Sequence, residues 1–163
     1  MLRKFILIFV CMGFVYVPHT AVADTAVYEL PLAKILTLVD KTKGQKRVLV
    51  VWVTKNKSSA RKVVGEFADL ENTMPGSVLS ISDDTDPLKL REFLASVPVL
   101  PYRVYRAKKA TGQNINQVLR KLGGKHLDRY PWVILLDEEN NIKGEGNIYM
   151  DYIVDFILKD AVQ

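Results

Sequence analysis

The sequence leaves little room for thiol chemistry, because its one cysteine, Cys11, lies in an apolar run near the N-terminus. A thiolate is the attacking species in disulfide exchange, and no other side chain replaces it. If that run is removed after export, the remaining chain contains no thiol. The sequence therefore predicts a protein that carries out no disulfide exchange of its own, with no catalytic residue and no cofactor.

Serine chemistry is the next candidate, since Ser58 and Ser59 are adjacent and His126 is the one histidine after residue 23. A serine nucleophile needs a base within hydrogen-bond reach and a further group that orients the base. A serine that caps a helix and a histidine in an exposed glycine-rich loop explain the same residues with fewer assumptions. A hydrolase or transferase built on these serines stays as an alternative.

Metal ligands are too few or wrongly spaced for a recognised site. Zinc sites use several Cys or His ligands, and His126 stands alone. The acidic group Asp83, Asp84 and Asp86 lacks the spaced loop and late glutamate of an EF-hand. These carboxylates suit instead the positive end of the dipole of a helix that starts at Pro87. We predict no metal.

Basic side chains form two groups that could recognise an anion. The first flanks a predicted helix start and a later proline, at Lys55, Lys57, Arg61, Lys62, Lys125 and Arg129; the second is Arg103, Arg106, Lys108 and Lys109, interleaved with Tyr102 and Tyr105. One interpretation is a docking face for an acidic peptide or partner protein, and the other is a solvated surface that maintains solubility. The net charge of +5 comes with no nucleic-acid motif, so nucleic acid is not expected.

An export signal accounts for the N-terminus. Arg3 and Lys4 precede an apolar run at residues 5–17, and Ala21-Val22-Ala23 forms a small-x-small cleavage site. A helix needs about 20 apolar residues to span a bilayer, and this run is shorter. The length therefore favours a cleaved signal over the alternative of an uncleaved membrane anchor. We predict a cleaved signal peptide at residues 1–23, a periplasmic location and a single domain at residues 24–163.

Helices and strands alternate along the rest of the chain. Hydrophobic periodicity and breakers predict helices at 31–42, from a cap at Ser58 or Ser59 to Pro75-Gly76, from Asp86 to about 97, at 115–122 and at 150–158. Apolar runs predict strands at 47–54, 77–82, 131–136 and 142–146, and an extended segment at 99–105. This order predicts an α/β sandwich.

Two segments carry a resemblance to a known family. Residues 48–59, VLVVWVTKNKSS, resemble the active-site strand and helix start of thioredoxins, especially the periplasmic type linked to cytochrome maturation. Aligned on Trp52, the two cysteines of that family's CxxC motif fall on Asn56 and Ser59, so the motif is replaced by Asn56-Lys57-Ser58-Ser59. Residues 129–137, RYPWVILLD, look like the family's cis-proline segment. The similarity covers most of residues 45–160.

The resemblance implies a thioredoxin-like three-layer sandwich, a central mixed sheet flanked by helices, with one extra helix inserted near residues 112–122. Pro131 would be the cis-proline, and Tyr130 would present its backbone beside the start of the Ser58 helix. In the family this edge pairs with an extended peptide of the partner, a form of strand addition. The two parts of the first basic group would then meet on one face. A trans proline that opens a strand is the alternative.

Three functions remain open. The first is a non-catalytic, thioredoxin-like binding or accessory protein that recognises a periplasmic protein or extended, acidic peptide through the groove at Tyr130 and Pro131. The second is a redox accessory that positions the thiols of a partner. The third is the serine-based enzyme. Contact with a membrane is expected only through an uncleaved signal.

Overall fold

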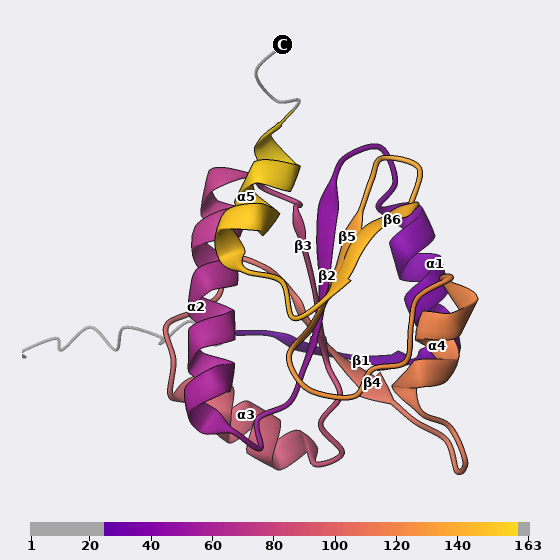
Figure 1. Cartoon of the computed structure of the whole chain (residues 1–163). Coiled ribbons are helices and arrows are strands. Elements are labelled where there is room, and N and C mark those ends of the chain that lie inside the picture. Colours follow the sequence, from indigo (N-terminus) through magenta and orange to yellow (C-terminus); the bar gives the residue numbers. More distant parts are fainter. Residues whose placement is uncertain (1–24, 160–163) are drawn as a thin grey trace, which may run out of the picture.

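The computed structural model describes residues 25–159 as a six-stranded sheet between two layers of helices (Figure 1). Cys11 and the predicted signal peptide lie outside these residues. The strands are β1 (Val27–Pro31), β2 (Arg47–Trp52), β3 (Val78–Ser82), β4 (Val104–Lys108), β5 (Trp132–Leu136) and β6 (Ile142–Gly146). The helices are α1 (Leu32–Lys41), α2 (Lys57–Thr73), α3 (Pro87–Ala95), α4 (Ile115–Lys121) and α5 (Met150–Leu158). Between residues 25 and 159, no helix has the length and apolar character needed to cross a membrane.

The sheet is mixed and has the order β1-β4-β3-β2-β5-β6. Its first four strands are parallel neighbours, whereas β5 runs antiparallel to β2 and β6 antiparallel to β5. Every residue of β2, β3 and β5 is buried, which is why β2 after Arg47 and β5 are apolar runs without alternation, whereas β3 buries two serines, Ser80 and Ser82. The predicted three-layer α/β sandwich with a central mixed sheet is confirmed.

Each face of the sheet has its own hydrophobic core. Helices α1 and α4 cover one face through residues such as Ile35 and Leu119, which pack against Leu49 and Ile81. Helices α2, α3 and α5 cover the other face (Figure 1). Helix α4, between β4 and β5, is the extra helix that the resemblance implies. Two helical layers thus fix the central strands from both sides.

Two strand predictions were incomplete. Strand β1 was not predicted, because its residues are mostly half-buried or exposed and it owes its conformation to parallel pairing with β4. The extended segment expected at 99–105 is displaced, since β4 begins at Val104. Pro98 and Pro101 have no backbone N–H to give to a ladder, so regular pairing starts only after them.

One helix start was predicted correctly and another was not. Asp86 caps α3, accepting hydrogen bonds from the backbone N–H groups of Leu88 and Lys89. The cap of α2 is Asn56 rather than Ser58 or Ser59. Asn56 has an extended backbone, and its Oδ1 accepts from the N–H of Ser59 at 3.2 Å. The serines are therefore in the first turn of α2.

Candidate functional site

The candidate site lies where β2 ends and α2 begins. Strand β2 ends at Trp52, a short loop follows, and α2 starts after Asn56. Asn56 and Ser59 are the positions to which the resemblance assigns the two cysteines. They are joined to each other by the capping hydrogen bond, so the first turn of α2 forms without a disulfide. An amide and a hydroxyl cannot exchange disulfides.

Tyr130 and Pro131 close this site from the side of β5. The peptide bond between them is cis, as the resemblance implies. Together with Asn56 and Ser59 they line a cavity of about 30 Å³ that has Trp52 in its wall. A water molecule needs roughly 10–15 Å³ of cavity volume, so this cavity has room for one or two water molecules but not for a side chain of a partner.

A larger groove continues from the same residues. It has a volume of about 350 Å³ and shares Ser59, Val63, Tyr130 and Pro131 with the small cavity. Apolar side chains make up much of its lining, at Val63, Phe67, Val133, Ile148, Met150 and Ile153, and Lys62, Glu66, Asn147 and Tyr149 also border it. Tyr149 is 85% exposed at its rim. The groove is wide enough for an apolar side chain of a bound peptide.

The main chain before Pro131 is unpaired. Regular pairing of β5 with β2 starts at Trp132, which is opposite Val51. Among the backbone hydrogen bonds outside helices and strands in residues 25–159, none involves Asp128, Arg129 or Tyr130. Residues 128–130 thus form a short free edge beside the groove.

The side chain of Tyr130 is held across the end of the sheet. Its hydroxyl donates to Oδ2 of Asp83 at 2.6 Å, and Oδ1 of Asp83 lies 2.8 Å from Nζ of Lys109. Asp83 is only 6% exposed. Burial raises the pKa of the Tyr130 phenol, as do the hydrogen bond to Asp83 and the negative charges of Asp83 and Asp84, so the hydroxyl remains a donor.

Asp84 holds the loop on the other side of the site. Its carboxylate accepts hydrogen bonds from the backbone N–H and the hydroxyl of Thr54 and from the hydroxyl of Ser82. The helix-capping role that the sequence predicts for Asp83, Asp84 and Asp86 is correct only for Asp86. Asp83 and Asp84 instead contact Tyr130 and Thr54, which are distant in sequence, and no local pattern predicts these contacts.

The first basic group is divided by the fold. Lys62 borders the groove, in an ion pair with Glu66, and Arg61 lines a different cavity of about 720 Å³ between α2 and residues 96–101. Lys125 pairs with Glu145, and Arg129 with Asp128. Lys55 and Lys57 are exposed near the start of α2. That these cations form one docking face remains a prediction.

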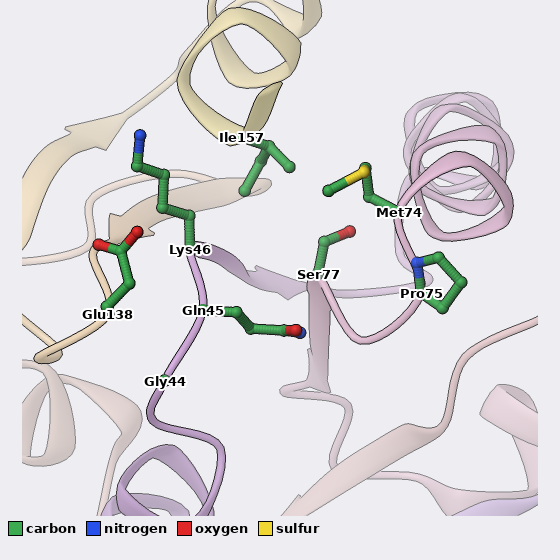
Figure 2. Close-up of a pocket in the computed structure, with 8 residues that line it drawn as sticks. All are labelled: Gly44, Gln45, Lys46, Met74, Pro75, Ser77, Glu138 and Ile157. Atoms are coloured by element: carbon green, nitrogen blue, oxygen red, sulfur yellow. The ribbon is translucent and has the colours of Figure 1, made fainter. Parts of the chain in front are cut away.

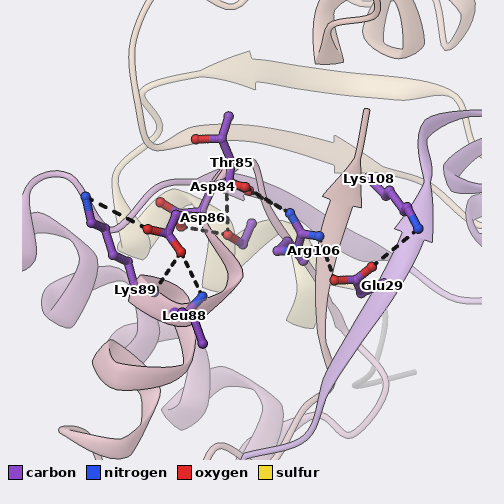
Figure 3. A network of polar contacts seen from close by, with 9 residues as sticks. Glu29, Asp84, Thr85, Asp86, Leu88, Lys89, Arg106 and Lys108 are labelled. Atoms are coloured by element: carbon purple, nitrogen blue, oxygen red, sulfur yellow. Dashed lines mark hydrogen bonds and ion pairs between the residues drawn. The ribbon is translucent and has the colours of Figure 1, made fainter. Parts of the chain in front are cut away.

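The second basic group is mostly engaged within the fold. Figure 3 shows Arg106, which is 8% exposed, pairing with Glu29 and donating to the backbone carbonyls of Asp84 and Thr85. Lys108 pairs with the same glutamate. These two side chains link β4 to Glu29 of β1, and Arg106 is largely buried by its contacts.

The alternative chemistries gain no support. The ring of His126 lies 3.4 Å from the amide nitrogen of Asn116 in α4, and no hydrogen bond found in residues 25–159 joins it to Ser58 or Ser59. Among residues 25–159, His126 is therefore not placed as a base for either serine. Within residues 25–159, no three His, Cys, Asp or Glu side chains form a group that could hold a metal ion.

A further cavity lies at the opposite ends of β2 and β3. It measures about 200 Å³ and is formed by the turn before β2, the turn before β3, Glu138 and Ile157 (Figure 2). Lys46 and Glu138 are the charged groups that line it. It contains no nucleophile with a base and is separated from the candidate site by the length of the strands.

Comparison with known proteins supports the fold assignment. No family model matches the sequence, and no curated protein matches it. Solved structures do: the exposed lipoprotein thioredoxin of Streptococcus pneumoniae superposes with a TM-score of 0.58 at 13% identity, over 74% of this chain and 89% of that one. A thiol:disulfide interchange protein DsbE from Chlorobium tepidum gives a TM-score of 0.57 at 17% identity, over 74% of this chain and 83% of that one.

A thiol:disulfide interchange protein from a Bacteroides species gives a TM-score of 0.58 at 15% identity, over 74% of this chain and 76% of that one. At such identities the likeness reports architecture, and architecture alone does not transfer an activity. The inserted α4 and the cis bond before Pro131 are the features that the sequence resemblance implied. The chain therefore has a thioredoxin-like fold, with asparagine and serine where the resemblance places the two cysteines of the CxxC motif.

Proposed function

We propose that this protein is a non-catalytic binding module that recognises an extended segment of a partner protein through the free edge at residues 128–130. The observation that carries the proposal is the absence of backbone partners for these residues, right beside a groove of about 350 Å³. Main-chain hydrogen bonds to such an edge supply affinity, and a neighbouring pocket for side chains supplies specificity.

The groove fits a partner segment with an apolar anchor. An apolar side chain of the segment would fill the space above Val63, Phe67 and Ile153. Exposed Lys55 and Lys57, near the start of α2, favour a segment that carries acidic residues. The periplasm is the proposed compartment, in keeping with the predicted signal peptide.

The lack of a cysteine pair supports a role without catalysis. Cys11 is the one cysteine of the whole sequence, so residues 24–163 contain no thiol. A redox role would require that the partner supply every reacting sulfur. Binding through the edge needs none, since it uses backbone groups and the groove.

The test is peptide selection followed by mapping. Purified residues 24–163 are used to select binders from a displayed library of random peptides, and the best binder is titrated into isotope-labelled protein while amide NMR signals are followed. We expect shifts concentrated at residues 128–131, in the first turns of α2 and at residues 147–150. Selected sequences should share an apolar residue with acidic neighbours.

Photo-crosslinking provides the matched control. A benzophenone amino acid replaces Tyr149, at the rim of the groove, or Tyr152, which is 57% exposed and does not line it. The selected peptide should crosslink from position 149 and not from position 152. If no peptide is selected, or if shifts map to the cavity at residues 96–101, the proposal is wrong.

A further inference from the structure

We propose that Asp83, with Lys109 as its counter-ion, is a positioning residue that holds Tyr130 and thereby sets the free edge in its binding arrangement. This inference rests on the proposed function and adds a residue that the resemblance does not assign to the site. The contact of Asp83 with Tyr130 would fix the conformation of residues 128–130 before a partner binds.

The contacts join three separate parts of the fold. Asp83 follows β3, Lys109 follows β4, and Tyr130 precedes β5. Strand β2 lies between β3 and β5 in the sheet. The hydrogen bond from Tyr130 to Asp83, at 2.6 Å, therefore crosses the end of β2. Asp83 is itself anchored there, because its N–H donates to the carbonyl of Trp52 at 2.8 Å.

The charge of Asp83 is balanced within the fold. The side chain of Asp83 is 4% exposed and that of Lys109 is 23% exposed, and the two form an ion pair of 2.8 Å. The Nζ of Lys109 also lies 3.4 Å from the backbone carbonyl of Asp83. A buried carboxylate needs such a partner, and a hydrogen bond from a neutral phenol to a charged acceptor is stronger than one between neutral groups.

Within residues 25–159, the phenol is the one polar group of Tyr130 for which a hydrogen bond is found. Its backbone makes no hydrogen bond outside the regular elements in residues 25–159, so the phenol is the polar contact that fixes this residue. Its ring lines both the small cavity and the groove. When the hydroxyl loses its acceptor, the ring and the edge sample several arrangements. A binding arrangement that is only partly populated weakens the observed affinity in proportion.

The decisive variant is Tyr130→Phe, which removes one hydroxyl and keeps the ring. We expect the peptide selected on the wild-type protein to bind this variant about fivefold to tenfold more weakly, with lower backbone NMR order parameters at residues 128–130. Tyr152→Phe removes a hydroxyl from an exposed tyrosine outside the groove and should change neither quantity. Equal affinity and equal order parameters in Tyr130→Phe would overturn the inference.

Asp83→Asn tests the partner side of the contact. Combined with Tyr130→Phe, it should weaken binding no more than the stronger single change does, because both act through one hydrogen bond. Fully multiplicative losses would contradict this. A readout without peptide is the ultraviolet titration of tyrosine: loss of the Asp83 charge should lower the pKa of the Tyr130 phenol. An unchanged titration would also count against the inference.

The two proposals fail in different ways. If the wild-type protein selects no peptide at the edge, the proposed function is wrong, while the order parameters and the titration still report whether Asp83 holds Tyr130. If the peptide binds at the edge but ignores both substitutions, the proposed function stands and Asp83 has no positioning role.

Discussion

The buried contact between Trp52 and Ser80 permits a quantitative test of how this core accommodates polar groups. The indole Nε1 donates to Oγ of Ser80 at 2.9 Å, and Trp52 is 1% and Ser80 0% exposed. Ser80→Ala leaves the indole N–H buried without an acceptor, which costs about 1–3 kcal/mol of unfolding free energy. The free energy of unfolding of the whole domain is expected to be only about 5–15 kcal/mol.

Substitution of the tryptophan removes the other half of the contact. Trp52→Phe keeps an aromatic ring near Phe93, whose ring centre lies 5.7 Å from that of Trp52, but it leaves a void and an unpaired Ser80 hydroxyl. Complete truncation of a buried aromatic costs about 3–5 kcal/mol, so we expect about 2–3 kcal/mol for this smaller change. The double variant leaves no unpaired group, and its loss should fall below the sum of the single losses by about 1–2 kcal/mol.

Ser77 is the matched control. It is 2% exposed, and its hydroxyl has no hydrogen-bond partner within residues 25–159. Ser77→Ala therefore removes no hydrogen bond and should leave stability unchanged or slightly higher. Both substitutions delete a single buried hydroxyl, so their difference isolates the contact with Trp52.

The assay is urea unfolding of residues 24–163, followed by far-ultraviolet circular dichroism because the tryptophan signal itself is altered. With a urea slope of about 2 kcal/mol per M, a loss of about 2 kcal/mol lowers the midpoint by about 1 M. Additive losses in the double variant, or a Ser77→Ala variant as unstable as Ser80→Ala, would refute the reasoning.

Three further predictions use other parts of the chain. Burial alone would raise the pKa of Asp137, but hydrogen bonds from Asn141 and Lys143 and from backbone N–H groups outweigh it and hold the pKa below its usual value of 3.8. This carboxylate therefore adds stability above that pH and loses it as the pH falls, so acid unfolding of Asp137→Asn should depend less on pH than that of the wild type. Gly65 is helical with open space around its Cα, and Gly65→Ala should raise the unfolding free energy by about 0.5–1 kcal/mol, whereas Gly76→Ala should lower it because φ there is +84°. Mass-verified residues 24–163 should not reduce a disulfide substrate, and measurable turnover would contradict the non-catalytic assignment.

Much of the fold was predictable because burial leaves a direct mark on sequence. The apolar run of β2 identified a strand covered on both faces, and Asp86-Pro87 identified a helix start by cap chemistry alone. The resemblance at residues 129–137 led to the cis-proline. Each of these signals is contained within a few consecutive residues.

The remainder depends on contacts between distant residues. Strand β1 shows no strong alternation, and its pairing with β4 decides its conformation. The sequence favours Ser58 or Ser59 as the cap of α2, although the helix is capped at Asn56, two or three positions earlier. The bond between Tyr130 and Asp83 spans 47 positions of sequence. From the sequence, Asp83 and Asp84 were expected near the start of a helix, and the contact of Asp83 with Tyr130 exists only because the sheet brings the two residues together.

The pairing of β1 with β4 also constrains the order in which the protein can assemble. Glu29 and Arg106, which fasten these strands together, are 77 residues apart. A chain made from its N-terminus has β1 available first, yet β4, with which it pairs in residues 25–159, is the last of the parallel strands to appear. Until β4 has been synthesised through Lys108, β1 has no strand to pair with. In a chain that ends earlier, β1 would remain an unpaired segment that can associate with other chains. The β1–β4 half of the sheet can therefore close only after the first 108 residues of the chain have been made.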